Sequence, residues 1–168
     1  MKRVILLAAA LLLLPVPTMA GPEKVIFPLY QNHNLVTIVD RPDIKEVRDV
    51  YATSEAVRMA RAGAAVPSGT VLTLVHFRAR MNDKGELLRD PNGRLVKGDL
   101  DRIGIMEKRT AWGTEYSDDI RNGEWEYALF RPDGTRNETA NIKGCFQCHK
   151  PKGVQDFIFT FEELRAAK

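Results

Sequence analysis

Alternating apolar and polar side chains predict a chain built mostly of short strands. The clearest pattern runs over 70–79, where Leu72, Leu74 and His76 share one face, because successive side chains of a strand point to opposite sides. The same reasoning, with turn-forming residues between the segments, predicts further strands at 35–39, 86–89, 94–97, 102–108 and 125–131.

Helical signals are few and short. The range 44–52 fits a helix or a strand, and a strand is favoured because Thr53 can then cap a helix over 54–62. A capping-box pattern at Thr160–Glu163 predicts a last helix over 161–167. The expected fold class is therefore α+β: a mostly antiparallel β-sheet with a few short helices.

The N-terminus has the pattern of a secretory signal peptide. Lys2-Arg3 precedes an apolar run, Val4–Leu14, which two prolines and small residues follow as far as Ala20. A membrane anchor is the alternative, but a span needs about 20 apolar residues and this run is shorter. We therefore expect residues 1–20 to be removed on export to the periplasm.

Composition limits the classes of partner. Among 168 residues there are 25 Lys and Arg and 22 Asp and Glu, and the formal charge of +3 falls to +1 without the leader. A nucleic-acid partner is not expected, because the chain has no basic run and no strong basic excess. No second long apolar stretch follows, so we expect residues 21–168 to form one domain with no membrane span.

The candidate chemistry lies in the pentapeptide Cys145-Phe146-Gln147-Cys148-His149. C-x-x-C-H is the attachment pattern of c-type haem: two thiols bond to the haem vinyl groups, and the histidine becomes an axial ligand of the iron. We therefore expect one haem c, held covalently through Cys145 and Cys148, with His149 on the iron.

Other uses of this motif are weaker. A zinc site needs a fourth ligand, and the remaining histidines, His33 and His76, lack a matching spacing. A redox dithiol usually opens a helix early in a βαβ chain, and a plain disulfide leaves His149 without a role. The motif also lies late in the chain: none of the 19 residues after His149 is Met or His, unlike small electron-carrier cytochromes.

The chain resembles cytochrome P-460 and its relatives, the cytochromes c′-beta, over about residues 44–164. The resemblance rests on five segments, at 46–51, 68–71, 104–109, 122–127 and, most specifically, 145–151 followed by 157–160. It implies a β-sheet haem pocket, one haem c with a proximal histidine, an iron whose distal side is open, and a homodimer.

One position departs from the hydroxylamine-oxidising branch of this family. That branch has a lysine covalently joined to the haem on the strand after the Gly-Thr turn, whereas Thr70–Phe77 contains no lysine and Leu74 occupies the matching position. The remaining resemblance is to the c′-beta branch, with five-coordinate iron in an apolar distal pocket. Three further distal candidates are Arg48 as a hydrogen-bond donor or surface ion pair, His76 as a sixth ligand or solvated residue, and Met106 as a ligand or packing residue.

The resulting hypothesis is a periplasmic mono-haem c-type cytochrome that binds nitric oxide or a similar small ligand and exchanges electrons with an unidentified redox partner. Two alternatives stay open. One is an enzyme that oxidises hydroxylamine or nitric oxide, and the other is a simple electron carrier with six-coordinate iron.

Overall fold

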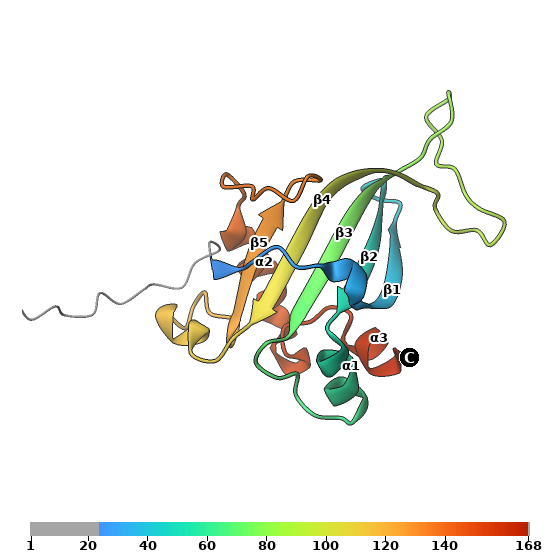
Figure 1. Cartoon of the computed structure of the whole chain (residues 1–168). Helices are drawn as coiled ribbons and strands as arrows, with labels where there is room; N and C mark the ends of the chain where they lie inside the picture. Colours follow the sequence, from blue (N-terminus) through green and yellow to red (C-terminus); the bar gives the residue numbers. More distant parts are fainter. Residues whose placement is uncertain (1–23, 168) are drawn as a thin grey trace, which may run out of the picture.

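A computed structural model describes residues 24–167, so the predicted signal peptide lies outside the described residues. These residues form a five-stranded antiparallel sheet in which each strand pairs with its sequence neighbour (Figure 1). The strands are β1 (Asn34–Arg41), β2 (Glu46–Ala52), β3 (Val71–Ala79), β4 (Lys97–Lys108) and β5 (Trp125–Phe130). The expected α+β, mostly β fold is confirmed.

The connection between β3 and β4 differs from the prediction. Residues 86–89 and 94–97 were expected to be strands, but the chain between β3 and β4 forms a long excursion from the end of the sheet (Figure 1). Its strand-like pairing is limited to two isolated bridges, Met81–Leu87 and Arg89–Leu95, and an ion pair between Arg94 and Asp40 ties it to β1. The segment is rich in turn residues, so it lacks the run of paired residues that a ladder needs.

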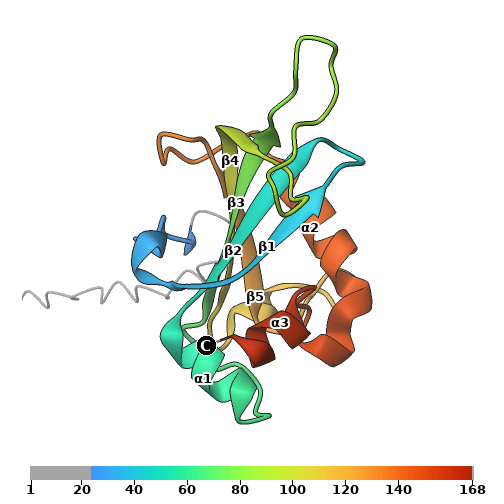
Figure 2. The same ribbon diagram turned by 90° about the vertical axis from the view of Figure 1, so that its right-hand side faces the viewer.

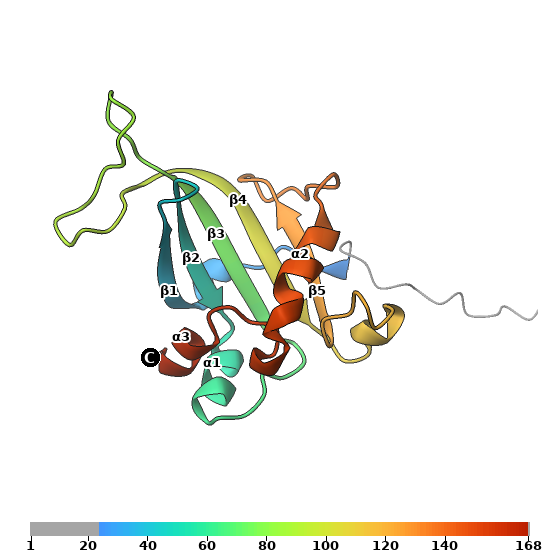
Figure 3. The ribbon, with the colours of Figure 1, turned by 180° about the vertical axis from the view of Figure 1, so that it is seen from behind.

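Within residues 24–167, three α-helices and several short 3-10 turns accompany the sheet. The α-helices are α1 (Ser54–Arg61), α2 (Ile142–His149) and α3 (Phe161–Ala166). Seen edge-on, α2 and α3 lie on one side of the sheet and the segment before β1 lies on the other (Figure 2). From behind, α2 lies over β4 and β5, and α3 lies beside α1 (Figure 3). No helix within residues 24–167 is long and apolar enough to cross a membrane.

The two threonines predicted to cap helices occupy the predicted positions but do not make the predicted hydrogen bonds. Thr53 and Thr160 occupy the N-cap positions of α1 and α3, but neither side chain accepts a capping hydrogen bond. At Thr160 the backbone, with ψ of 38°, is not in the extended conformation that aims a cap oxygen at the first turn. The Thr53 hydroxyl is buried without a partner. Packing against the sheet, rather than capping, stabilises these short helices.

The two faces of the sheet bury separate apolar clusters. On the helix side, Trp125, Leu72 and Phe146 pack with residues of α1 and α3. On the other side, Val75 and Ile103 pack beneath the segment that contains Val25. The strand alternation predicted for β3 is therefore confirmed, and Leu72, Leu74 and His76 face the helix side. This is the face on which α2 presents the cysteine motif.

Candidate functional site

Helix α2 carries the whole motif, although the sequence did not predict a helix there. The Asn141 side chain caps it by accepting a hydrogen bond from the Gly144 amide at 3.1 Å. The buried Phe146 ring packs against the rings of Tyr116 and Tyr127, with centroids 4.9 and 4.8 Å apart. These contacts fix one side of α2 against β5, and leave the cysteines on a different side of the helix.

The two cysteines are free thiols one helical turn apart. Residues three apart in a helix lie on the same side, so Cys145 and Cys148 can approach one edge of a single bound group. Cys145 is partly buried, and this burial, with the neighbouring Cys148, raises the pKa of its thiol. Cys148 is exposed.

His149 is oriented for metal binding through Nε2. Its Nδ1 lies 2.6 Å from the backbone oxygen of Phe157. A carbonyl oxygen can only accept, so Nδ1 carries the hydrogen and Nε2 keeps its lone pair. The ring also packs against Tyr127 and, edge-on, against Phe159. Burial lowers the pKa of the imidazole, which keeps it in the neutral form that binds metals.

A cavity of about 300 Å³ separates α2 from the sheet. Helix α2 contributes Cys145, Cys148 and His149 to its lining. The opposite wall comes from β3, β4 and β5 and contains Leu72, Leu74, His76, Arg102, Gly104 and Met106. The three residues of the motif therefore face one space with a mainly apolar wall, which is typical of cofactor and small-ligand sites.

The predicted distal candidates separate into two groups. Leu74, His76 and Met106 all line the wall opposite α2. Arg48 does not line the cavity, and its guanidinium is bound instead to the carboxylate of Glu46, with Nε 2.9 Å from Oε2. The distal roles proposed for these residues stay predictions, and their positions supply the geometry against which those roles can be tested.

Sequence reasoning missed several residues of this wall. Arg102 and Gly104 share a face of β4 with Met106, four and two positions before it along the strand, so the alternation that selected Met106 also pointed to them. Tyr127, which lies beside Met106 in the neighbouring strand, also lines the cavity. Burial raises the pKa of Tyr127, and its hydroxyl oxygen accepts a hydrogen bond from Asn122 at 3.0 Å.

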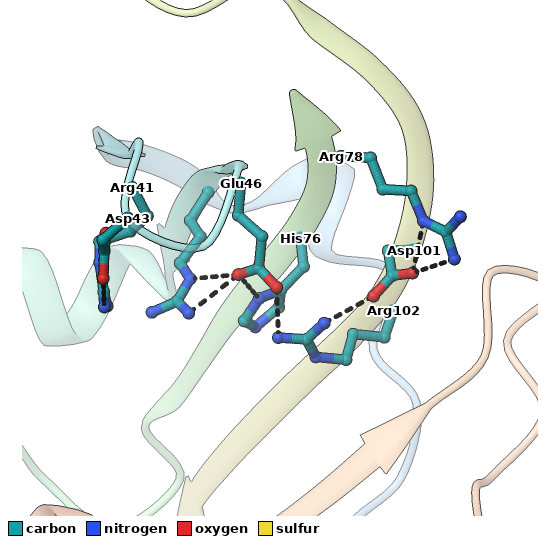
Figure 4. Close-up of polar contacts among 8 residues, drawn as sticks. Arg41, Asp43, Glu46, His76, Arg78, Asp101 and Arg102 are labelled. Atoms are coloured by element: carbon teal, nitrogen blue, oxygen red, sulfur yellow. Dashed lines mark hydrogen bonds and ion pairs between the residues drawn. The ribbon is translucent and has the colours of Figure 1, made fainter. Parts of the chain in front are cut away.

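One end of the cavity wall is strongly polar. Figure 4 shows the Glu46 carboxylate in contact with the side chains of both His76 and Arg102, and the carboxylate of Asp101 in contact with Arg102. Glu46 Oε1 accepts from Arg102 Nη2 at 2.8 Å. Burial opposes ionisation of Glu46, but hydrogen bonds from His76, Arg102 and Arg48 outweigh it and lower its pKa to about 2. Glu46 is therefore an ionised carboxylate held by the basic side chains around it.

The sequence model of the family described as Cytochrome P460 matches residues 29–160, which is most of the chain. The chain belongs to the cytochrome P460 family. The family implies a haem cofactor, in agreement with the resemblance found in the sequence. No curated protein matches this chain closely enough to add a second comparison.

The cavity of this cytochrome P460 family member fits a haem. Two thiols and an imidazole line one cavity from a single helix, which is the donor set that c-type haem uses. On the opposite wall Gly104 presents no side chain, and a Cβ there would lie 3.4 Å from Leu129 and 3.7 Å from both Leu74 and His76. The glycine thus leaves room between the strands and α2 for a flat group.

Proposed function

We propose that this protein is a periplasmic mono-haem c-type cytochrome with an open distal site, which binds nitric oxide or a similar small ligand and transfers electrons. The observation that carries the proposal is the common cavity of Cys145, Cys148 and His149, with Leu74 on the facing wall. A bound haem supplies iron that binds small ligands and changes oxidation state.

The chain attaches and orients this group from α2. Cys145 and Cys148 form the two thioether bonds, and their separation by one turn matches two attachment points on one edge of the haem. His149 provides Nε2 to the iron, while Phe157 holds the opposite ring nitrogen. That hydrogen bond fixes the plane of the imidazole and raises its strength as a ligand.

The facing wall favours small uncharged ligands. Leu72, Leu74 and Met106 line part of the cavity with apolar side chains, and an ion bound against this part would lose hydration without a polar partner. Leu74 occupies the position at which the hydroxylamine-oxidising branch of the family has its cross-linking lysine. We therefore place the protein with the ligand-binding branch rather than with the oxidising enzymes, and expect a homodimer that meets a redox partner in the periplasm.

An optical spectrum of the haem-loaded protein, before and after addition of carbon monoxide, tests the proposal. We expect a high-spin ferrous spectrum without the red shift of a modified haem, and this spectrum should change when carbon monoxide binds. A red-shifted ferrous band would indicate a modified haem and support the oxidising enzyme. Sharp low-spin bands that carbon monoxide leaves unchanged would support six-coordinate iron, with His76 or Met106 as the second ligand. Purified protein without a haem band would contradict the proposal as a whole.

A further inference from the structure

A row of three basic side chains crosses the sheet at the polar end of the cavity. Arg48 on β2, His76 on β3 and Arg102 on β4 are direct register partners. All three contact one carboxylate, that of Glu46, which lies two residues before Arg48 on β2. Figure 4 shows the contacts of Glu46 with His76 and Arg102. His76 and Arg102 also line the cavity, so this cluster connects the interior of the site to Glu46.

The contact with Glu46 determines which nitrogen of His76 carries its hydrogen. His76 Nδ1 lies 3.2 Å from Glu46 Oε2. An ionised carboxylate only accepts hydrogen bonds, so Nδ1 is the donor and Nε2 keeps an unprotonated lone pair. Nε2 lies on the cavity side, where it would be 3.7 Å from a Cβ on Gly104. The strand wall of the cavity therefore carries one unprotonated nitrogen, His76 Nε2, beside its apolar side chains.

His76 is kept neutral by its surroundings. Only 6% of the residue is exposed, and this burial, with the positive charges of Arg102 and Arg48, lowers its pKa to about 4 although Glu46 acts in the opposite direction. An anion arriving next to Nε2 would reverse this balance, because a negative charge close to an imidazole favours its protonated form.

We propose that His76 is the proton acceptor of the cavity, and that it allows the site to bind small ligands that give up a proton as well as ligands that have none. This inference rests on the proposed function, because it requires a ligand-binding haem in the cavity. Glu46 is a positioning residue in this scheme. It holds Nδ1–H and so keeps Nε2 directed at the ligand, and its charge compensates the imidazolium once that forms.

The proton balance can be written with hydrogen cyanide as the probe. The H–C bond breaks, the electron pair stays on cyanide, and the proton forms a new N–H bond at His76 Nε2. No oxidation state changes. The new Nε2–H can then donate a hydrogen bond to the bound anion, and no proton reaches the solvent.

The measurement is the cyanide affinity of the ferric, haem-loaded protein between about pH 5.5 and 7.5, where free cyanide is hydrogen cyanide. For the wild type we expect an affinity that does not change with pH, since His76 takes up the proton. For His76→Gln we expect the proton to enter the solvent, so the affinity should rise about tenfold per pH unit. Carbon monoxide brings no proton, so its affinity should not depend on pH in either protein.

Two variants control the result. His33→Gln removes a histidine that does not line the cavity and should leave the cyanide affinity independent of pH. Glu46→Gln keeps an acceptor for Nδ1–H but removes the compensating charge, so the affinity should begin to rise with pH at a lower pH than in the wild type. A similar flat response in His76→Gln would assign the proton to another group and overturn the proposal.

The wild type alone provides a second test, should His76→Gln fail to fold. Calorimetric titration with cyanide in two buffers of different ionisation enthalpy counts the protons released. We expect a count near zero. Release of about one proton per haem by a fully loaded protein would refute the role of His76 and leave the proposed function intact, whereas protein without haem would contradict the proposed function itself.

Discussion

Gly104 on β4 lies directly opposite Leu74 on β3, and together they form the part of the strand wall that faces α2. A Cβ at Gly104 would meet Leu74, His76 and Leu129 at ordinary contact distances, so a methyl group fits but larger groups must enter the cavity. The residue opposite Leu74 therefore has no side chain, and the width of the cavity at this point depends on the residue at position 104.

We expect Gly104→Val to weaken carbon monoxide binding about tenfold, because overfilling a packed site costs on the order of 1 to 3 kcal/mol. Gly104→Ala should change the affinity little. Titration of the ferrous protein by absorbance measures both. Val71→Ile adds volume to the opposite face of β3 and is the matched control. Equal affinities for all variants would mean that the ligand binds away from this wall.

Leu74→Lys is expected to change the spin state of the ferric iron or its carbon monoxide affinity, because the new amine reaches into the space that faces His149. Absorbance and electron paramagnetic resonance spectra report the spin state. Leu35→Lys places the same group on an exposed position of β1 and should have no effect. Identical spectra for Leu74→Lys and the wild type would place position 74 away from the iron.

The haem is expected to stay on the wild-type chain during extraction with acidified organic solvent, since thioether bonds survive unfolding. The double variant Cys145→Ser with Cys148→Ser should release it completely, and each single variant should retain it through one bond. Mass spectrometry of the extracted chain measures the retained haem. Extraction of haem from the wild type would show that these cysteines do not form the bonds.

Asn141→Ala should lower the free energy of unfolding by about 1 kcal/mol, because the N-terminus of α2 loses the cap that Asn141 provides to Gly144. Urea unfolding followed by circular dichroism measures the change. Asn92→Ala, at an exposed position of the excursion between β3 and β4, is the control and should have little effect. A neutral Asn141→Ala would mean that packing of Phe146 alone is sufficient for α2.

Acid should destabilise the fold through His76. Its pKa is about 4 in the folded protein, against 6.5 for an unperturbed histidine, so between these values the unfolded chain binds the proton more tightly. The contribution of His76 to stability is therefore complete above about pH 6.5, and stability falls by about 2 to 3 kcal/mol towards pH 4.5. Protonation of Glu46, whose pKa is about 2, lowers the stability further only at lower pH.

The check is urea unfolding of the wild type and His76→Gln at several values between pH 4.5 and 7.5. The slope against pH should be smaller in the variant. It should not vanish, because burial also lowers the pKa of His149. Parallel curves for the two proteins would show that His76 is already protonated, or exposed, across this range.

The strands could be predicted because the alternation of apolar and polar side chains is a local property of the sequence. It predicted that Leu72, Leu74 and His76 share a face, and all three line the cavity. The polar cluster around Glu46 could not be predicted in this way. The contact of Glu46 with Arg102 depends on the register of three strands, and the pairing of β3 with β4 shifts just after His76. Such a shift leaves no mark in a single sequence.

Helix α2 was missed for a different reason. Its eight residues include a glycine, and only Phe146 among them is buried, so no apolar period marks the helix. Its stability comes from a cap and from aromatic contacts with Tyr116 and Tyr127, which are distant in sequence. The motif nevertheless identified Cys145, Cys148 and His149 as a group, because its spacing has chemical meaning independent of secondary structure.

The hydrogen bond between His149 and Phe157 has an acceptor that belongs to the backbone. Asp156 and Phe157 both have left-handed φ values, 52° and 62°, which shape the turn that presents this oxygen. Any amino acid at position 157 carries the same carbonyl group, so ordinary mutagenesis there removes ring packing and leaves the acceptor in place. Alanine substitution at position 157 therefore does not remove the acceptor, whereas replacing the following amide by an ester weakens this carbonyl directly as an acceptor.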